Sequence, residues 1–203
     1  MEKGEALEHF IKNYVKTESS VKMQKLKVYS ENNKDILIDD FVESFRRICV
    51  KIKDMQDKGE KGEIGYITYS LLRTNIMEGK LVYLIEAFNR IWFFDRIECQ
   101  EEYDVRWAYQ FLDEFEAELI EKSKPYLNKI GMPDIERVKL KEIALYNNVV
   151  IELAKEAILN ASEIKEFSDI LKEDVIEIRI GEYKGPSEVI YRKESNAISG
   201  AKL

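Results

Sequence analysis

The fold is decided by residues Gly62 to Glu121, which read GEIGYITYSLLRTNIMEGKLVYLIEAFNRIWFFDRIECQEEYDVRWAYQFLDEFEAELIE. Both tryptophans of the chain and a dense series of tyrosines and phenylalanines lie in this stretch. Aromatic side chains bury the largest apolar area per residue. We therefore expect the hydrophobic core to be centred here.

The second half of this stretch is strongly acidic. Ten acidic residues and two arginines lie between residues 95 and 121, whereas the whole chain carries a formal net charge of −7. The rest of the chain is therefore close to neutral, and the negative charge is concentrated beside the aromatic residues.

Residues 103–121 have the spacing of an amphipathic helix. Trp107, Phe111 and Phe115 recur every fourth residue and fall on one flank of a helical projection. We predict a helix over this range, with its aromatic flank in the core.

Two glutamates lie at the border of that flank. Glu114 and Glu118 are four residues apart, a spacing at which like charges repel unless a cation neutralises them. The more common arrangement is a solvated rim of a core helix, with lysine or arginine from another helix opposite. The alternative is a pocket whose carboxylates bind a cation, an amine or a basic partner.

Apolar residues recur at helical spacing in several other segments. The clearest pattern is that of residues 38–55, which Asn33 or Asp35 can cap and Gly59 can end. The charged turn that follows, residues 57–62, lacks the spacing of a phosphate loop and is expected in solvent. Further helices are predicted over residues 5–27, with a break at Ser19-Ser20, over residues 63–76 and from Asp134 to Ala157.

Two segments are predicted to be β-hairpins. Residues 80–95 contain LVYLIEAF and RIWFFD, whose β-branched and aromatic residues favour strand, turn and strand, although the apolar spacing also fits a helix. Residues 174–192 alternate between apolar and polar on both sides of a Lys-Gly-Pro turn. The predicted fold is α+β and predominantly helical, with about five helices packed with a small antiparallel sheet or two β-hairpins.

We expect one globular domain over residues 1–192, because the composition is globular and nothing resembles a long linker. The tail has little to bury. The expected parts are an N-terminal helical part (1–60), a central aromatic and acidic part (62–124), a long helix with a hairpin (133–192) and a tail (193–203).

The sequence lacks the common patterns of catalytic and metal sites. The single histidine, His9, cannot build a multi-histidine zinc site, and Cys49 and Cys99 have no CxxC partner. No GxSxG, HExxH, GxGxxG or EF-hand loop occurs. We predict no catalytic residue, no metal and no cofactor.

Charge and hydropathy exclude two classes of partner. An acidic chain is a poor match for nucleic acid, because phosphates need clustered lysine and arginine. No apolar run is long enough to cross a bilayer, and the polar start MEKGEALEHF lacks the apolar region of a secretory signal. We therefore expect a cytoplasmic protein that binds neither nucleic acid nor membrane.

Two functions remain compatible with the sequence. The first is a non-catalytic interaction or regulatory module, whose acidic, aromatic-rich face meets a protein partner or a second copy of the chain. The second is a sensor or enzyme with a small-molecule pocket of aromatic residues and carboxylates. The candidate pocket residues are Tyr69, Arg73, Trp92, Trp107, Glu114 and Glu118.

Overall fold

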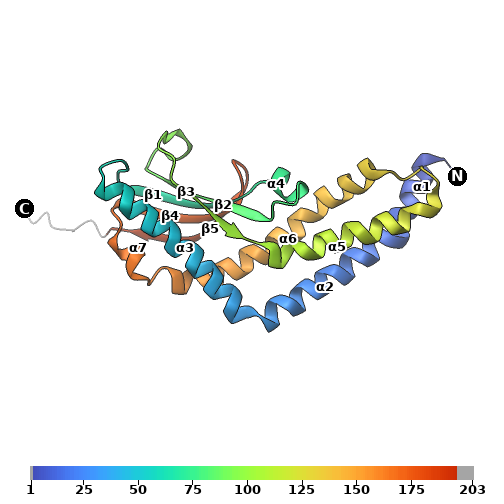
Figure 1. The fold of residues 1–203 in the computed structure, drawn as a ribbon, viewed down its shortest axis with the longest axis horizontal. Helices are drawn as coiled ribbons and strands as arrows, with labels where there is room; N and C mark the ends of the chain where they lie inside the picture. Colours follow the sequence, from blue (N-terminus) through green and yellow to red (C-terminus); the bar gives the residue numbers. More distant parts are fainter. Residues whose placement is uncertain (1, 196–203) are drawn as a thin grey trace, which may run out of the picture. The chain divides into compact units, whose positions relative to one another are not determined.

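The computed structural model describes residues 2–195 (Figure 1). The predicted class, α+β and predominantly helical, is confirmed. No helix within these residues combines the length and the apolar character needed to span a bilayer. The chain forms two compact units: a helical unit of residues 2–38, 72–82 and 104–153, and a sheet unit of residues 39–71, 83–103 and 154 onward.

The helical unit is built largely from long helices. In it α2 packs along α5, where the ring of Tyr29 meets that of Phe111 edge-on at 5.8 Å between centroids. The break predicted at Ser19-Ser20 is wrong, because the helix continues through both serines and only widens to a π-turn at residues 11–15. The unit contains α1 (Lys3–Phe10), α2 (Lys16–Asn32), α4 (Arg73–Met77), α5 (Arg106–Ser123) and the first part of α6 (Met132–Ala161).

The sheet unit contains, within residues 2–195, one five-stranded mixed sheet of order β3-β2-β1-β4-β5 (Figure 1). β1 runs antiparallel to β2 and parallel to β4, and β4 runs antiparallel to β5. The predicted C-terminal hairpin is present as β4 and β5, but it joins a larger sheet with a parallel pair at its centre. The strands are β1 (Ile64–Leu71), β2 (Val82–Phe88), β3 (Gln100–Asp104), β4 (Lys172–Glu182) and β5 (Ser187–Glu194).

Two predicted elements are corrected by the structure. The helix predicted over residues 63–76 is β1 followed by the single turn α4. The hairpin predicted over residues 80–95 is β2 followed by a 3-10 turn, Trp92–Phe94, so RIWFFD forms no strand. In the predicted tail, β5 extends to Glu194, and residues 196–203 lie outside the described residues.

One face of the sheet carries the core of its unit. The helix α3 (Lys34–Asp57) places Phe41 on the ring of Tyr69, with 4.8 Å between the centroids. The hydroxyl groups of Ser44 and Tyr69 lie 3.1 Å apart beneath the same strand. Phe45 packs against Phe167 of α7 (Lys165–Asp169) on this side as well. The apolar stripe predicted for residues 38–55 is therefore the surface that covers the sheet.

Candidate functional site

The second face of the sheet carries several polar side chains. Side chains alternate between the two faces of a strand, and Tyr69 meets α3, so Thr68 and Ser70 point the other way. The register places Glu86 of β2 and Arg179 of β4 on either side of Thr68. We call this surface, which bears Thr68, Ser70, Glu86 and Arg179, the open face.

The connection between β2 and β3, residues 89–99, contains Trp92 and lies over the open face; we call it the Trp92 turn. The indole of Trp92 stacks on the ring of Tyr66 with centroids 4.2 Å apart, and the guanidinium of Arg179 lies 5.0 Å from the indole ring centre. Trp92 also has a positive φ of 54°. This conformation is costly for a bulky residue, and such strain is concentrated at binding and catalytic sites.

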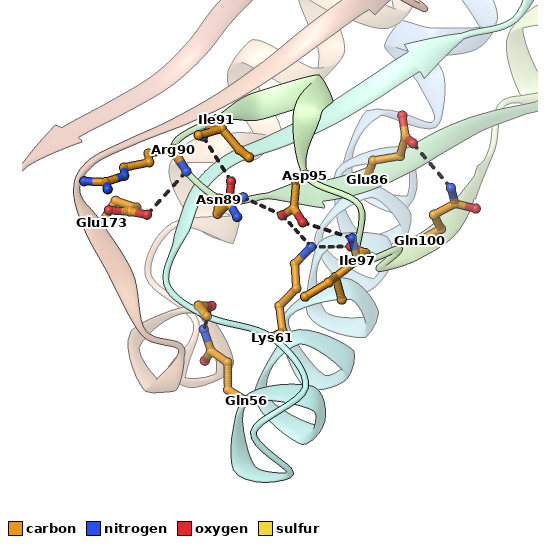
Figure 2. Close-up of polar contacts among 11 residues, drawn as sticks. Gln56, Lys61, Glu86, Asn89, Arg90, Ile91, Asp95, Ile97, Gln100 and Glu173 are labelled. Atoms are coloured by element: carbon orange, nitrogen blue, oxygen red, sulfur yellow. Dashed lines mark hydrogen bonds and ion pairs between the residues drawn. The ribbon is translucent and has the colours of Figure 1, made fainter.

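A buried ion pair holds this turn in place (Figure 2). The ammonium of Lys61 lies 2.8 Å from a carboxylate oxygen of Asp95, and the two side chains are 1% and 2% exposed. Asp95 also accepts hydrogen bonds from the backbone N–H groups of Asn89 and Ile97, at 2.9 and 3.0 Å. The prediction that the charges of residues 57–62 lie in solvent is therefore wrong for Lys61.

The same contacts set the charge state of Asp95. Burial alone would raise the pKa of its carboxyl group. The hydrogen bond from Lys61 and the two backbone N–H groups outweigh burial, and the pKa is lowered from its ordinary value. Asp95 is thus a fixed anion at neutral pH, around which the backbone of the turn is organised.

A pocket of about 590 Å³ opens between the Trp92 turn, β1, β4 and the β4–β5 turn. We call it the sheet pocket. Trp92, Phe93 and Phe94 form its aromatic wall. The β4–β5 turn passes directly over Gly181, where a Cβ atom would lie 2.4 Å from the carbonyl oxygen of Pro186. The remaining lining residues are Thr68, Tyr69, Ser70, Ile91, Arg179, Gly181, Glu182, Lys184, Gly185, Pro186 and Ser187.

Arg179 is largely engaged by neighbours within the sheet. Its guanidinium donates to Glu177 Oε2 at 2.7 Å, and to the hydroxyl and the carbonyl of Ser187 at 3.1 Å each. This network ties the β4–β5 turn to the open face. Arg179 therefore shapes the wall of the sheet pocket rather than offering free donors.

Buried polar atoms without a partner are concentrated on the open face and its covering turn. Across residues 2–195, five buried side-chain nitrogen or oxygen atoms have no hydrogen-bond partner, and three of them are Thr68 Oγ1, Trp92 Nε1 and Glu86 Oε2. Leaving such an atom unpaired costs about 1–3 kcal/mol, so each occurrence calls for an explanation. A bound molecule that supplies the missing partners would remove this cost.

The predicted site residues fall into two groups. Tyr69 and Trp92 both line the sheet pocket, although the hydroxyl of Tyr69 contacts Ser44 on the opposite face. The other four belong to the helical unit and are not among the residues that line this pocket. Of these, Arg73 donates to the carbonyl of Leu140 at 2.8 Å, Trp107 is 8% exposed, and Glu118 is exposed. Glu114, the last of them, is paired with lysines.

The negative charge of the acidic helix α5 is partly neutralised by these and other lysines within the helical unit. Glu114 accepts hydrogen bonds from Lys22 at 3.0 Å and Lys25 at 3.3 Å, and chiefly the first of them lowers the pKa of its carboxyl group. Lys139 is almost fully buried and lies 2.7 Å from Glu116. Lysines from neighbouring helices thus lie opposite the carboxylates of α5. This is the more common arrangement described above, as opposed to a pocket whose carboxylates bind a cation, an amine or a basic partner.

The cysteines and the histidine are not among the residues that line the sheet pocket. Both thiols are buried, and burial raises the pKa of Cys49 to about 12 and that of Cys99 above its ordinary value. His9 lies on α1, with Nδ1 2.7 Å from the hydroxyl of Tyr126. Among residues 2–195, no group of three or more His, Cys, Asp or Glu side chains is arranged to hold a metal ion.

Several residues of the open face were not identified from the sequence. Glu86 is the one charged residue in the apolar run LVYLIEAF, and a charge inside an apolar run is the signal that could have identified it. Arg179 occupies a regular polar position of the alternating run IEIRI and carries no such signal. Thr68 carries no such signal, because threonine is common in strands.

Comparison with known proteins adds no indication of function. No protein-family model, no curated protein and no solved structure matches the chain.

Proposed function

We propose that the chain binds a small organic molecule in the sheet pocket. The observation that carries this proposal is the pair of buried atoms without partners at its wall, Thr68 Oγ1 and Trp92 Nε1. Ligand pockets are typically concave sites with apolar and aromatic walls and a few polar groups that fix the orientation of the ligand. The sheet pocket combines these features.

The donors and acceptors at the wall define the kind of ligand. The indole N–H of Trp92 can only donate, so the ligand needs an acceptor such as a carbonyl or carboxylate oxygen. The hydroxyl of Thr68 can donate or accept. Lys184 is an exposed residue of the pocket lining, and its charge favours an acidic group. These groups favour a flat molecule with an apolar ring and a carbonyl or acid function.

Binding has to involve a movement of the Trp92 turn. Both unpartnered atoms are closed to solvent, so a ligand reaches them only when the indole shifts from its stack on Tyr66. The positive φ of Trp92 supports such a movement, because a strained turn gains stability by relaxing. Ligand binding should therefore change the fluorescence of Trp92.

Replacing Trp92 with alanine should weaken binding. Native mass spectrometry of protein isolated from a cell extract identifies a retained molecule, and a library of aromatic acids and amides supplies further probes. Trp92→Ala is expected to weaken binding of whichever probe binds by about tenfold or more, since aromatic residues dominate binding energy. Leu159→Ala truncates an exposed apolar residue of the same unit outside the pocket and serves as the control. Equal binding by Trp92→Ala and the control would contradict the proposal.

Thr68→Val should separate binding from stability. The substitution removes a buried hydroxyl without a partner, so the free energy of unfolding should stay constant or rise by up to about 1 kcal/mol. Affinity for the ligand should fall, because the hydroxyl becomes its hydrogen-bond partner. Chemical denaturation and a binding titration measure the two effects, with Thr74→Val as the same change at an exposed position. A loss of stability without a loss of affinity would assign the hydroxyl a structural role.

A protein partner or self-association through the acidic face of α5 stays a prediction. Its support is weaker than that of the pocket, because Lys22 and Lys139 neutralise part of the charge that would attract a basic partner. Native mass spectrometry also reports the number of subunits. A second copy or a co-purified protein with an empty pocket would favour this alternative.

A further inference from the structure

A second pocket lies beside the sheet pocket, in the same unit. It has a volume of about 320 Å³ and is bordered by the end of β2, by residues 95–100 and by the β4–β5 turn. Phe93 and Lys184 line both pockets. The carboxyl group of Glu86 belongs to the lining of this second pocket.

Glu86 is buried, and only one of its two carboxylate oxygens has a hydrogen-bond partner. The residue is 7% exposed, and its Oε1 accepts one hydrogen bond, from Gln100 Nε2 at 3.3 Å (Figure 2). Its Oε2 has no partner among the described residues. Desolvation accordingly raises the pKa of this carboxyl group. A carboxylate in this position is stabilised by any cation that can reach it.

The other walls of the pocket already accommodate a cation. The ammonium of Lys184 lies 5.2 Å from the ring centre of Tyr183 and 6.0 Å from that of Phe93, which are cation–π distances. It forms no ion pair with Glu86, although its charge partly offsets the effect of burial by lowering the pKa of that carboxyl group. Two exposed residues of opposite charge, Arg96 and Glu98, also line the pocket, so Glu86 is the buried carboxylate there without an ion-pair partner.

We propose that the second pocket is a binding site for an organic cation, in which the carboxylate of Glu86 accepts hydrogen bonds from a primary ammonium group. Phe93 and Tyr183 pack against the carbon skeleton that bears the amine. Lys184 and Phe93 are exposed and move aside to admit it. The side chain of Lys184 competes with the ligand for this site, because its own ammonium lies against the same two rings. This site does not require a ligand in the sheet pocket.

Phenethylamine is a suitable probe, because it joins a primary ammonium group to an aromatic ring, and 2-phenylethanol is its neutral counterpart. Calorimetric titrations at a pH above the pKa of Glu86 should show binding of the amine at millimolar concentration and much weaker binding of the alcohol. Glu86→Gln should weaken amine binding by about tenfold or more, the range for a lost charge-assisted hydrogen bond. Glu63→Gln removes one exposed charge outside both pockets and should leave the affinity unchanged.

Lys184→Met supplies an effect of opposite sign. Removing the competing ammonium should strengthen amine binding, whereas a purely structural role of Lys184 would weaken it. The ¹³C resonance of the Glu86 carboxyl group should also show a lower pKa when the amine is bound. The proposal is wrong if Glu86→Gln binds the amine as tightly as the original chain does, if the alcohol binds equally well, or if no amine binds at millimolar concentration.

Discussion

Replacing Lys61 with methionine is expected to lower the free energy of unfolding by about 3–5 kcal/mol, the usual cost of leaving one member of a buried ion pair without its partner. Methionine keeps the length of the side chain but leaves the carboxylate of Asp95 buried with only the N–H groups of Asn89 and Ile97. The Trp92 turn should then lose its fixed conformation. Denaturation in urea measures the first effect, and loss of ligand binding in the sheet pocket measures the second.

Two further variants show whether the ion pair itself is responsible. Lys58→Met removes a lysine of the same connection whose partner, Asp54, is exposed, and it should leave stability almost unchanged. Adding Asp95→Asn to Lys61→Met removes both charges and should recover part of the lost stability. If Lys58→Met and Lys61→Met behaved alike, the pair would not be the element that holds the turn.

The ion pair also has a predictable pH dependence. The pKa of Asp95 is lowered in the folded protein, so its contribution to stability is complete above the pKa of an unfolded aspartate, about 3.9. That contribution is lost as the pH falls through the lower pKa of the folded state. Lys61→Met should therefore flatten the acid side of the stability profile.

Phe41→Ala is expected to lower the free energy of unfolding by about 3–5 kcal/mol, the range for truncating a fully buried phenylalanine. The ring of Phe41 is 0% exposed, stacks on Tyr69 and meets Tyr103 edge-on at 5.5 Å. Its removal leaves a cavity between α3 and the sheet. Val50→Ala, at a position of the same helix that is 52% exposed, is the control for a shortened apolar side chain.

Chemical denaturation and a structure of Phe41→Ala test this assignment of the core. The cavity should lie on the face of the sheet opposite the sheet pocket, so binding by the folded variant should change less than its stability. A loss of stability no larger than that of Val50→Ala would mean that the core of this unit is not centred on Phe41.

The helices were the predictable part of this fold. In α3 the buried residues recur every third and fourth position, and α5 follows the aromatic spacing of Trp107 and Phe111. Such periodicity depends only on local sequence. The C-terminal hairpin was equally accessible, because Ile176 and Ile178 alternate with polar residues on a strand with one buried face.

β1 shows where local sequence stops being informative. Nearly all of its residues are buried, so it lacks the alternation of a strand with one solvated face, and Ile64, Ile67 and Leu71 happen to have helical spacing. The β-branched and aromatic residues of IGYITY were the competing signal. The parallel pairing of β1 with β4 had no local signal at all.

The candidate site was only partly predictable for a related reason. Trp92 and Tyr69 were chosen because aromatic residues line pockets whatever the topology, and both belong to the lining of the sheet pocket. Lys61 and Asp95 lie 34 positions apart, and nothing in either segment indicates that they meet. Arg73, Trp107, Glu114 and Glu118 were chosen with them from composition, which does not show that the chain divides into two compact units.

The parallel pairing of β1 with β4 also bears on how the protein folds. Tyr66 pairs with Glu177, so the centre of the sheet joins residues 111 positions apart. Closing so long a loop costs conformational entropy before the strand pairing can stabilise the closed loop, and such contacts slow folding. During synthesis, β1 and β2 leave the ribosome long before β4 exists. We therefore expect the sheet pocket to form only after β4 and β5 have left the ribosome.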